Sequence, residues 1–341
     1  MKIITLEEHF QTKEINDATR RFAEQSMAQQ DTLDQSATAS DPLDTLIFDL
    51  GEGRLRQMDA MGVDMQILST AGVQMLPAAE AIPLARDANE QLAAAIKAHP
   101  DRLAGFATLP TPDPEAAAAE LERTVRQLGF KGAMILGRTN ERFLDHPSFR
   151  PLLAAAEALE APIYLHPTFP PKAVQDAYYA GLDPMVSQRL ATAGWGWHME
   201  AGIHAWRMIL SGVFDRFPRL QIILGHWGEM IPYYLARTEQ IVSQAPATKA
   251  LQRRLSDYFV EQFYVTPSGL FTLPPFQLCL QILGADRIMY SVDYPIMAGA
   301  PARSFLENAP SARLIRRRSP MGMPSGCSRW RMQADERHKD V

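Results

Sequence analysis

Short apolar segments alternate with helical segments along most of this chain, and that alternation limits the folds open to it. Eight segments have the length and apolar content of buried strands, and a helical pattern follows each of them, weakly after the last. Such alternation indicates an α/β protein with a parallel sheet, because parallel neighbours need a crossover between them. We predict strands at about residues 2–6, 65–69, 103–109, 132–136, 162–166, 220–225, 262–266 and 287–293.

The number eight favours closure of the sheet into a (β/α)8 TIM barrel, a fold of ~250 residues. The 341-residue chain can hold one barrel over residues 1–310, with insertions after strand 1 (about 11–50) and strand 5 (about 167–195). The first insertion is either an active-site lid or a solvated excursion. An open, doubly wound sheet is the alternative fold, but no glycine-rich phosphate-binding sequence follows strand 1. We predict helices at about 12–29, 53–62, 82–98, 114–128, 147–160, 196–216, 229–243 and 272–283.

Charge and composition argue against several classes of function. The net charge is −5, so the chain has no basic footprint for nucleic acid. Its apolar stretches fall short of the ~20 residues that a membrane helix needs, and its first residues lack a signal-peptide pattern. Cys279 and Cys327 have no metal-binding spacing and do not suggest a disulfide framework. We therefore expect a cytoplasmic protein that binds neither nucleic acid nor membrane.

Polar residues end several of the predicted strands. Strand 1 runs into Glu7-Glu8-His9, where residues two apart share a face, so Glu7 and His9 point together and Glu8 points away. His166 ends strand 5, and Asp293 ends strand 8. Taken singly, each residue also fits a structural role, as a solvated acid, a core histidine or a turn cap. In a parallel barrel, however, these ends open onto one face, and the mixed N/O set suits one divalent metal, Zn or Mn.

A second histidine–carboxylate pair follows the predicted sixth strand. His226 and Glu229 are three residues apart at the start of a predicted helix, so they can touch. A carboxylate bonded to the imidazole would orient it and make His226 a candidate acid/base, whereas the alternative is that Glu229 only stabilises the helix start. Arg237 lies eight residues beyond Glu229 on roughly the same helical face. It is expected to bind either a substrate carboxylate or a surface acid.

The remaining histidines and nearby tryptophans are less clearly assigned. Two histidines on the predicted helix 196–216 are expected to be structural or to line the substrate site, namely His198 and His204. Three others are expected on the solvated surface, namely His99, His146 and His338. Three tryptophans fit an aromatic pocket, a packed core or a subunit interface equally well, namely Trp195, Trp197 and Trp206.

Four of these sequence pieces together resemble the amidohydrolase superfamily, in particular its branch of metal-dependent, non-oxidative decarboxylases. That branch includes γ-resorcylate, 2,3-dihydroxybenzoate and 5-carboxyvanillate decarboxylases and, more distantly, aminocarboxymuconate semialdehyde decarboxylase. The resemblance covers about residues 1–310. The pieces are Leu6-Glu7-Glu8-His9-Phe10, Tyr164-Leu165-His166-Pro167, Leu224-Gly225-His226-Trp227-Gly228-Glu229 and Tyr290-Ser291-Val292-Asp293-Tyr294-Pro295.

The resemblance implies a (β/α)8 barrel with one catalytic Zn or Mn ion, in a homodimer or homotetramer. The metal ligands of that branch correspond here to Glu7, His9, His166 and Asp293. Its acid/base pair corresponds to His226 and Glu229, with Asp293 as a further catalytic residue. Its carboxylate-binding residue corresponds to Arg237. Phe10, at the end of the first piece, is expected to contact the substrate as well.

The implied activity is decarboxylation of a small aromatic or unsaturated carboxylic acid, such as an ortho-hydroxybenzoate. Many hydrolases of the superfamily begin with His-x-His, whereas this chain has Glu7-x-His9, which favours decarboxylation. A metal-dependent hydrolase of a lactone or amide on the same barrel is the alternative, and a binding protein without catalytic activity is a third reading. Metal content and the released product distinguish the three.

The region after residue 310 departs from the rest of the chain. Residues 311–341 contain eight Arg or Lys and three Asp or Glu, a balance of +5 in an otherwise acidic chain. One interpretation is a disordered basic tail that binds an acidic partner.

The other interpretation of this tail starts from the resemblance. Family members close with a helix similar to Gly-Asn-Ala-Glu-Arg-Leu-Leu. A DNA sequence that encodes such a helix encodes residues 319–328 of this chain when its reading frame is shifted by one base. We therefore hypothesise a frameshift near Ser311, which gene sequencing tests; an uninterrupted frame shared by the tails of close relatives would contradict it. A barrel without its last helix would lose several kcal/mol out of ~5–15.

Overall fold

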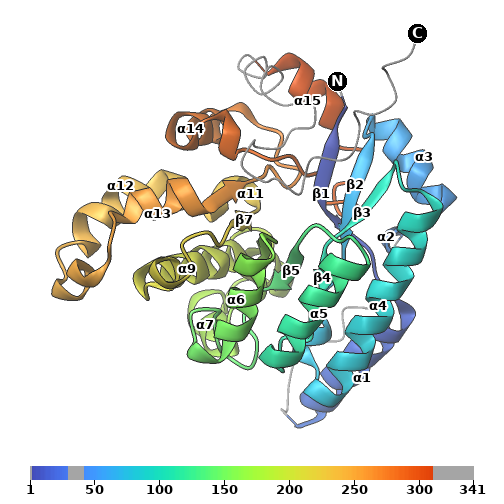
Figure 1. The fold of residues 1–341 in the computed structure, drawn as a ribbon, viewed down its shortest axis with the longest axis horizontal. Coiled ribbons are helices and arrows are strands. Elements are labelled where there is room, and N and C mark those ends of the chain that lie inside the picture. Colours follow the sequence, from blue (N-terminus) through green and yellow to red (C-terminus); the bar gives the residue numbers. More distant parts are fainter. Residues whose placement is uncertain (1, 30–41, 310–341) are drawn as a thin grey trace.

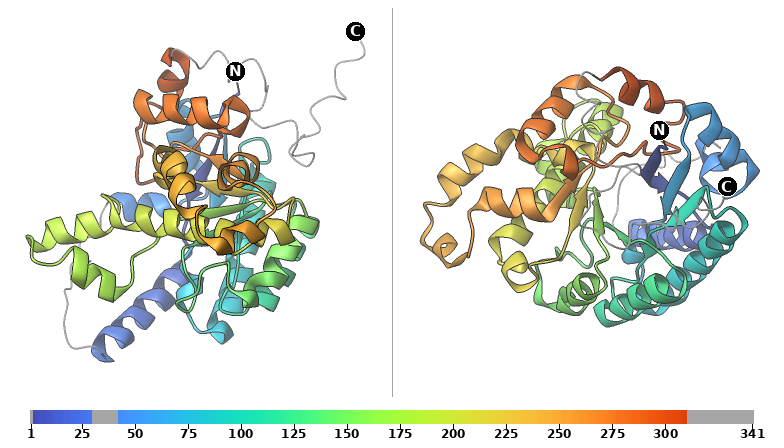
Figure 2. Two further views of the ribbon diagram at one scale, coloured as in Figure 1. Left: turned by 90° about the vertical axis from the view of Figure 1, so that its left-hand side faces the viewer. Right: turned by 45° about the horizontal axis from the view of Figure 1, so that its top comes forward.

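Parallel strands form an inner ring, and helices cover its outside (Figures 1 and 2). The computed structural model describes residues 2–29 and 42–309. The predicted basic tail, 311–341, and its hypothesised frameshift lie outside the described residues.

The predicted strands appear as two runs of parallel pairing. The first run is β1–β2–β3 and the second is β4–β5–β6–β7–β8. The first seven predicted strands each overlap an observed strand, the third in two pieces. The bounds are β1 Ile4–His9, β2 Met65–Ser69, β3 Leu103–Gly105, β4 Ala107–Thr108, β5 Ala133–Leu136, β6 Ile163–His166, β7 Ile222–Leu224 and β8 Phe263–Val265.

Backbone hydrogen bonds join the two runs into one ring. The predicted third strand is interrupted at Phe106, whose N–H donates to Leu68 (2.8 Å), while the next residue donates to Gly132 (2.8 Å). The predicted eighth strand is wrong as a regular strand. Residues 288–291 make only isolated bridges to β8 and β1, and the backbone then turns into the left-handed region at Asp293 (φ 64°). Even so, Leu6 N–H donates to Tyr290 (3.0 Å) and Met289 N–H donates to Val265 (2.9 Å), which connects the last strand position to the first.

The interior of the ring is filled by one side chain from each of the eight strand positions. These eight are all buried and form their own cluster, namely Leu6, Ile67, Phe106, Met134, Tyr164, Ile223, Tyr264 and Met289. A layer of this kind is how a closed barrel fills its centre. A larger apolar core lies between the ring and the helices. The fold is therefore the predicted (β/α)8 TIM barrel.

Most predicted helices are present, and proline and glycine positions explain several of their ends. Asp113 caps α5 with Pro114 in the first turn, and Gly62 ends α3 in a left-handed conformation. The prediction missed α2 in the first insertion, α7 and α8 in the second, and α13. Helix bounds are α1 Lys13–Gln29, α2 Pro42–Ile47, α3 Glu52–Met61, α4 Ala78–Ala98, α5 Pro114–Gln127, α6 Arg150–Ala158, α7 Lys172–Tyr178, α8 Pro184–Ala191, α9 Gly196–Leu210, α10 Val213–Arg216, α11 His226–Glu229, α12 Ile231–Val242, α13 Leu255–Gln262, α14 Leu273–Leu283 and α15 Ala302–Asn308.

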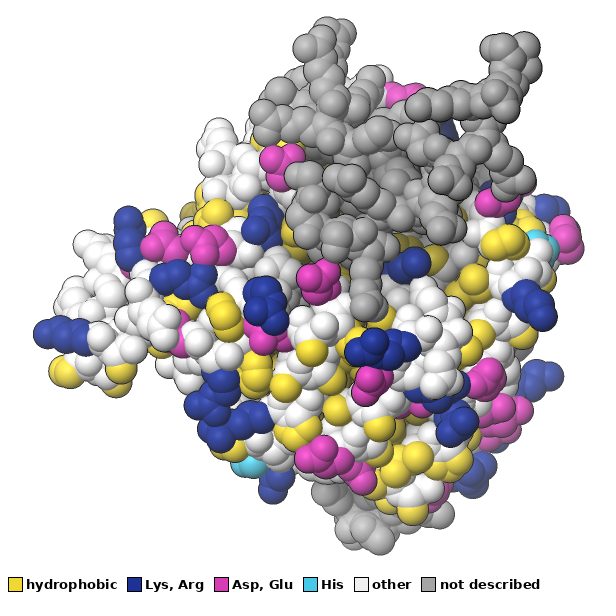
Figure 3. Space-filling view, viewed as in Figure 1, with side chains coloured by type: hydrophobic (Ala, Val, Ile, Leu, Met, Phe, Trp, Pro, Cys, Tyr) yellow, Lys and Arg dark blue, Asp and Glu magenta, His cyan; other side chains and the backbone are white. Residues whose placement is uncertain are grey.

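The outer surface carries mixed charge and one projecting arm. Helices α12 and α13 extend away from the barrel at the left of Figure 1. Acidic and basic side chains are interspersed over the face drawn in Figure 3. Within residues 2–29 and 42–309, no helix combines the length and apolar character needed to cross a membrane.

Candidate active site

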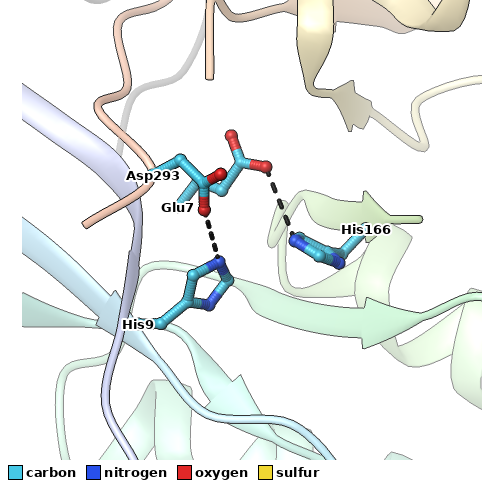
Figure 4. Close-up of side chains that lie close together, drawn as sticks. All are labelled: Glu7, His9, His166 and Asp293. Carbon is cyan, nitrogen blue, oxygen red and sulfur yellow. Dashed lines mark ion pairs between the residues drawn. The ribbon is translucent and has the colours of Figure 1, made fainter. Parts of the chain in front are cut away.

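The four predicted metal ligands meet at the carboxyl ends of the strands (Figure 4). Glu7, His9, His166 and Asp293 each offer a donor atom, and these atoms all lie within 4.8 Å of one another. His9 Nε2 lies 3.0 Å from Asp293 Oδ1, and His166 Nε2 lies 3.6 Å from Glu7 Oε1. The structure thus brings together residues that are up to 286 positions apart in the chain.

A bulge in β1 sets the directions of the first two ligands. The pairing of β1 with β2 shifts register between Thr5 and Glu8, and Glu7 has a left-handed backbone (φ 65°). Glu8 points away from the metal-binding residues, as predicted. Its carboxylate accepts the N–H groups of Val292 (2.9 Å) and Tyr294 (3.3 Å), which flank Asp293. Glu8 therefore ties β1 to the segment that carries the fourth ligand.

The hydrogen bonding around these ligands fits a divalent cation. Glu7 is fully buried, and its Oε2 accepts hydrogen bonds from the hydroxyls of Ser268 and Ser291. Its Oε1 has no hydrogen-bond partner among the residues that the structure describes. A buried carboxylate oxygen without a partner is costly unless a cation satisfies it. Burial also raises the pKa of Glu7. Mn or Zn would complete this mixed N/O set.

His166 is prepared as a neutral ligand. Its Nδ1–H donates to the carbonyl of Pro167 (2.8 Å), which leaves the lone pair of Nε2 facing Glu7. Burial, together with the nearby His9, lowers the pKa of His166 to about 3. Metal-binding histidines commonly donate their second N–H to a carbonyl in this way.

His226 and Glu229 make the predicted contact on a backbone that is not the predicted helix. His226 Nδ1 lies 2.7 Å from Glu229 Oε1. Their backbones are left-handed, with φ of 48° and 52°, and Met230 continues the turn with φ of 65°. The turn lies close to the metal ligands, because a Cβ on Gly225 would lie 3.0 Å from Glu7 Oε1. A glycine is needed at that approach.

The pair is charged at neutral pH. Burial by itself lowers the pKa of His226, but the adjacent Glu229 raises it to about 9. Burial raises the pKa of Glu229, but His226 and His198 hold it below its usual value. The arrangement can hold a proton at a defined ring nitrogen, which is what an acid/base catalyst requires.

His198 is the third member of this group; the sequence predicted a structural or substrate-lining role for it, but not its contact with Glu229. His198, in the first turn of α9, places Nδ1 2.8 Å from Glu229 Oε2, and its ring centroid lies 4.4 Å from that of His226. No sequence signal beyond residue type indicates this contact, because it depends on how α9 packs against the turn at 226–230. A Cβ on Gly202 would lie 2.8 Å from the carbonyl oxygen of Glu229, so the helix approaches closely there.

The structure does not bring the two predicted substrate contacts into the site of a single copy. Arg237 is exposed on α12 and donates to Gln240 (3.3 Å). Counting helical turns from Glu229 was wrong, because the left-handed Met230 separates the two residues. Phe10 is 1% exposed and packs in the core between ring and helices. That burial assigns Phe10 to packing and does not support its predicted substrate contact.

The other aromatic and histidine side chains separate into structural and site-adjacent groups. His204 is buried and accepts the N–H of Leu144 (2.8 Å), so it is structural. Trp197 lies 6.4 Å from His198 and 5.8 Å from Phe169, measured between ring centroids. The remaining tryptophans and histidines differ in exposure. Trp195 and His146 are exposed, Trp206 and His99 are half-buried, and His338 lies outside the described residues.

Comparisons with known proteins agree with this geometry. Residues 41–314 match the family described as Amidohydrolase. The chain is 39% identical over 307 residues to the γ-resorcylate decarboxylase of Rhodococcus jostii (strain RHA1), which covers 86% of this chain and 88% of that protein. The structure is similar to 5-carboxyvanillate decarboxylase LigW from Sphingomonas paucimobilis, with TM-score 0.81, 34% identity, and 92% and 96% of the two chains covered. A dihydroxybenzoic acid decarboxylase from Polaromonas sp. JS666, solved with manganese and the inhibitor 2-nitroresorcinol, matches with TM-score 0.77, 34% identity, and 91% and 92% covered.

Proposed function

This chain belongs to the amidohydrolase family and is a metal-dependent decarboxylase of aromatic carboxylic acids, a premise from which we propose that its substrate is a benzoate with a hydroxyl group ortho to the carboxylate. The observation that carries the proposal is the meeting, at one barrel mouth, of four cation ligands and a separate imidazole–carboxylate pair. The alternative of a lactone or amide hydrolase loses support, because the relatives compared above are decarboxylases.

The metal that we propose is manganese, with zinc as an alternative for the same ligands. Glu7, His9, His166 and Asp293 would hold it. A cation held there would act as a Lewis acid and stabilise negative charge on the substrate. Cys279 is buried and free, which fits the reducing cytoplasm that we propose as the location.

We propose that Asp293 transfers the proton that the ring carbon receives. Its carboxylate accepts the proton of the ortho hydroxyl and passes it to the ring carbon that bears the carboxylate group. The bond from that carbon to the carboxylate then breaks, its electron pair restores the aromatic ring, and CO2 leaves. The product phenolate takes a proton from water on release. His226, held by Glu229, donates a hydrogen bond to the phenolic oxygen and stabilises its charge.

Arg237 acts, in this proposal, on the substrate of a neighbouring copy. It lies on the projecting helix α12, where Tyr233 and Tyr234 are 74% and 53% exposed. Further large apolar side chains are exposed on the neighbouring helices, namely Met185, Val186, Leu190, Met199 and Ile203. Exposed apolar surface of this extent is typical of a protein interface. We therefore propose a homodimer or homotetramer that brings Arg237 of one copy to the carboxylate held by another.

The proposal is tested with the full chain loaded with Mn²⁺. We expect CO2 release from 2,6-dihydroxybenzoate or 5-carboxyvanillate and none from 3,5-dihydroxybenzoate, which lacks an ortho hydroxyl. Asp293→Asn should retain metal but lose turnover by about 10²–10⁴-fold, the usual contribution of a positioned acid or base. Turnover at the wild-type rate in that variant would refute the role of Asp293.

A further inference from the structure

His198 makes two hydrogen bonds whose acceptors cannot donate. Its Nδ1 lies 2.8 Å from Glu229 Oε2, and its Nε2 lies 2.8 Å from the carbonyl oxygen of Ala193. A carbonyl oxygen and an ionised carboxylate only accept hydrogen bonds. Both bonds therefore form together only when His198 carries a proton on each ring nitrogen.

The second imidazole completes the hydrogen bonding of Glu229. Its Oε1 accepts from His226 (2.7 Å) and its Oε2 from His198 (2.8 Å), while the carboxylate itself is fully shielded from solvent. Without His198, Oε2 would be a buried acceptor without a protein partner, and the carboxylate could rotate about its last bond. The ring nitrogen Nε2 of His226 makes no hydrogen bond with any part of the chain that the structure describes.

The hydrogen bonding of these three groups argues against a second metal site. His198, His226 and Glu229 offer donor atoms close enough together to hold a cation. Both ring nitrogens of His198, however, already donate to acceptors, at 2.8 Å each, so neither has a lone pair for a metal.

We propose that His198 is a positioning residue for the decarboxylation site. It donates to Glu229 from the side opposite His226, so the carboxylate is held at both oxygens and the imidazole of His226 keeps one orientation. Its second bond, to Ala193, anchors the end of the second insertion to the same carboxylate. The inference rests on the proposed acid/base role of His226.

Two amide variants separate these two hydrogen bonds. In His198→Asn the amide nitrogen lies near the position of Nδ1 and can still donate to Glu229, whereas in His198→Gln it lies near Nε2 and can reach only Ala193. We expect His198→Gln to lower kcat by about 10–100-fold, as losses of supporting hydrogen bonds commonly do, with KM and bound metal unchanged. We expect His198→Asn to stay within about threefold of wild type. His146→Gln, the same substitution at an exposed histidine outside the site, is the matched control and should retain full activity.

A measurement that needs no turnover accompanies the kinetics. The signals of His198 are identified in ¹⁵N-histidine-labelled wild type at pH 7 as those that are absent from His198→Gln. They should be the signals of an imidazole that is protonated at both ring nitrogens. A neutral imidazole at this position, wild-type kcat in His198→Gln, or equal losses in both amide variants would overturn the proposal. If no hydroxybenzoate is turned over by wild type, the proposed substrate fails, and the nitrogen signals still decide whether His198 holds Glu229.

Discussion

Two clusters of the same side-chain types lie at the barrel mouth, and they differ in what satisfies their carboxylates. In the cluster of Glu7, His9, His166 and Asp293, Glu7 Oε1 is buried and finds no hydrogen-bond partner within residues 2–29 and 42–309. In the cluster around Glu229, an imidazole donates a hydrogen bond to each carboxylate oxygen. In the first cluster, a cation would satisfy the carboxylate oxygen that has no partner. In the second, imidazole N–H groups already satisfy both carboxylate oxygens. Hydrogen bonding, rather than residue type, therefore distinguishes a metal site from a proton-holding site here.

Removing a ligand from the first cluster should have the largest effect. His166→Ala, or chelation of the wild type, should lower turnover by at least about 10³-fold, because a metal supplies several kcal/mol of charge stabilisation. Mn²⁺ should raise the melting temperature of the wild type and leave that of His166→Ala unchanged. Metal quantification accompanies both assays. Full activity in metal-free protein would show that the first cluster does not act as a metal site.

Breaking the second cluster should leave the metal in place. Glu229→Gln keeps the shape of the side chain but loses the charge that holds His226, and we expect kcat to fall about 10²-fold. Bound metal per chain should equal that of the wild type. If Glu229→Gln also lost its metal, the two clusters would be one functional unit.

The second cluster should also give stability that depends on pH. Burial lowers the pKa of His226, but Glu229, with smaller contributions from Glu7 and Asp293, raises it overall from 6.5 to about 9. The stabilisation is therefore full below pH 6.5 and is lost as the pH rises through about 9. The shift corresponds to about 3 kcal/mol, counted once for the pair. In urea unfolding of metal-free protein, the stability difference between wild type and Glu229→Gln should shrink by about that amount from pH 6 to pH 10. A difference that is constant with pH would contradict a charged His226–Glu229 pair.

Arg237 should give the smallest effect, because it lies outside both clusters of its own copy. Arg237→Ala should raise KM about tenfold with little change in kcat, since it removes one charged hydrogen-bonding group from substrate binding. With substrate well below KM, Arg237→Ala should retain about a tenth of wild-type activity. Mixing and refolding it with the inactive His166→Ala should raise the activity to about a quarter of wild type, because the mixed form of the proposed dimer has one complete site. If mixing the two variants does not increase activity, Arg237 either acts within its own chain or has no part in catalysis.

The sequence by itself determined the ring of strands and the types of residue at its mouth. Period and apolar content are local properties, so β2 was predicted with the bounds observed and α5 to within one residue. Because all strands of a parallel barrel end on one face, the positions of Glu7, His9, His166 and Asp293 at predicted strand ends were enough to bring them together.

Tertiary structure decided the rest, for reasons that lie in contacts between distant segments. The turn at His226 is left-handed, and the last strand is irregular before Asp293; neither conformation follows from residue propensity, because the surrounding packing imposes it. His198 meets Glu229 only through the approach of α9, and Arg237 lies on α12, which the left-handed Met230 separates from Glu229. A pattern along the chain identifies which groups are available, but hydrogen bonds between separate elements determine whether a carboxylate holds a cation or a proton.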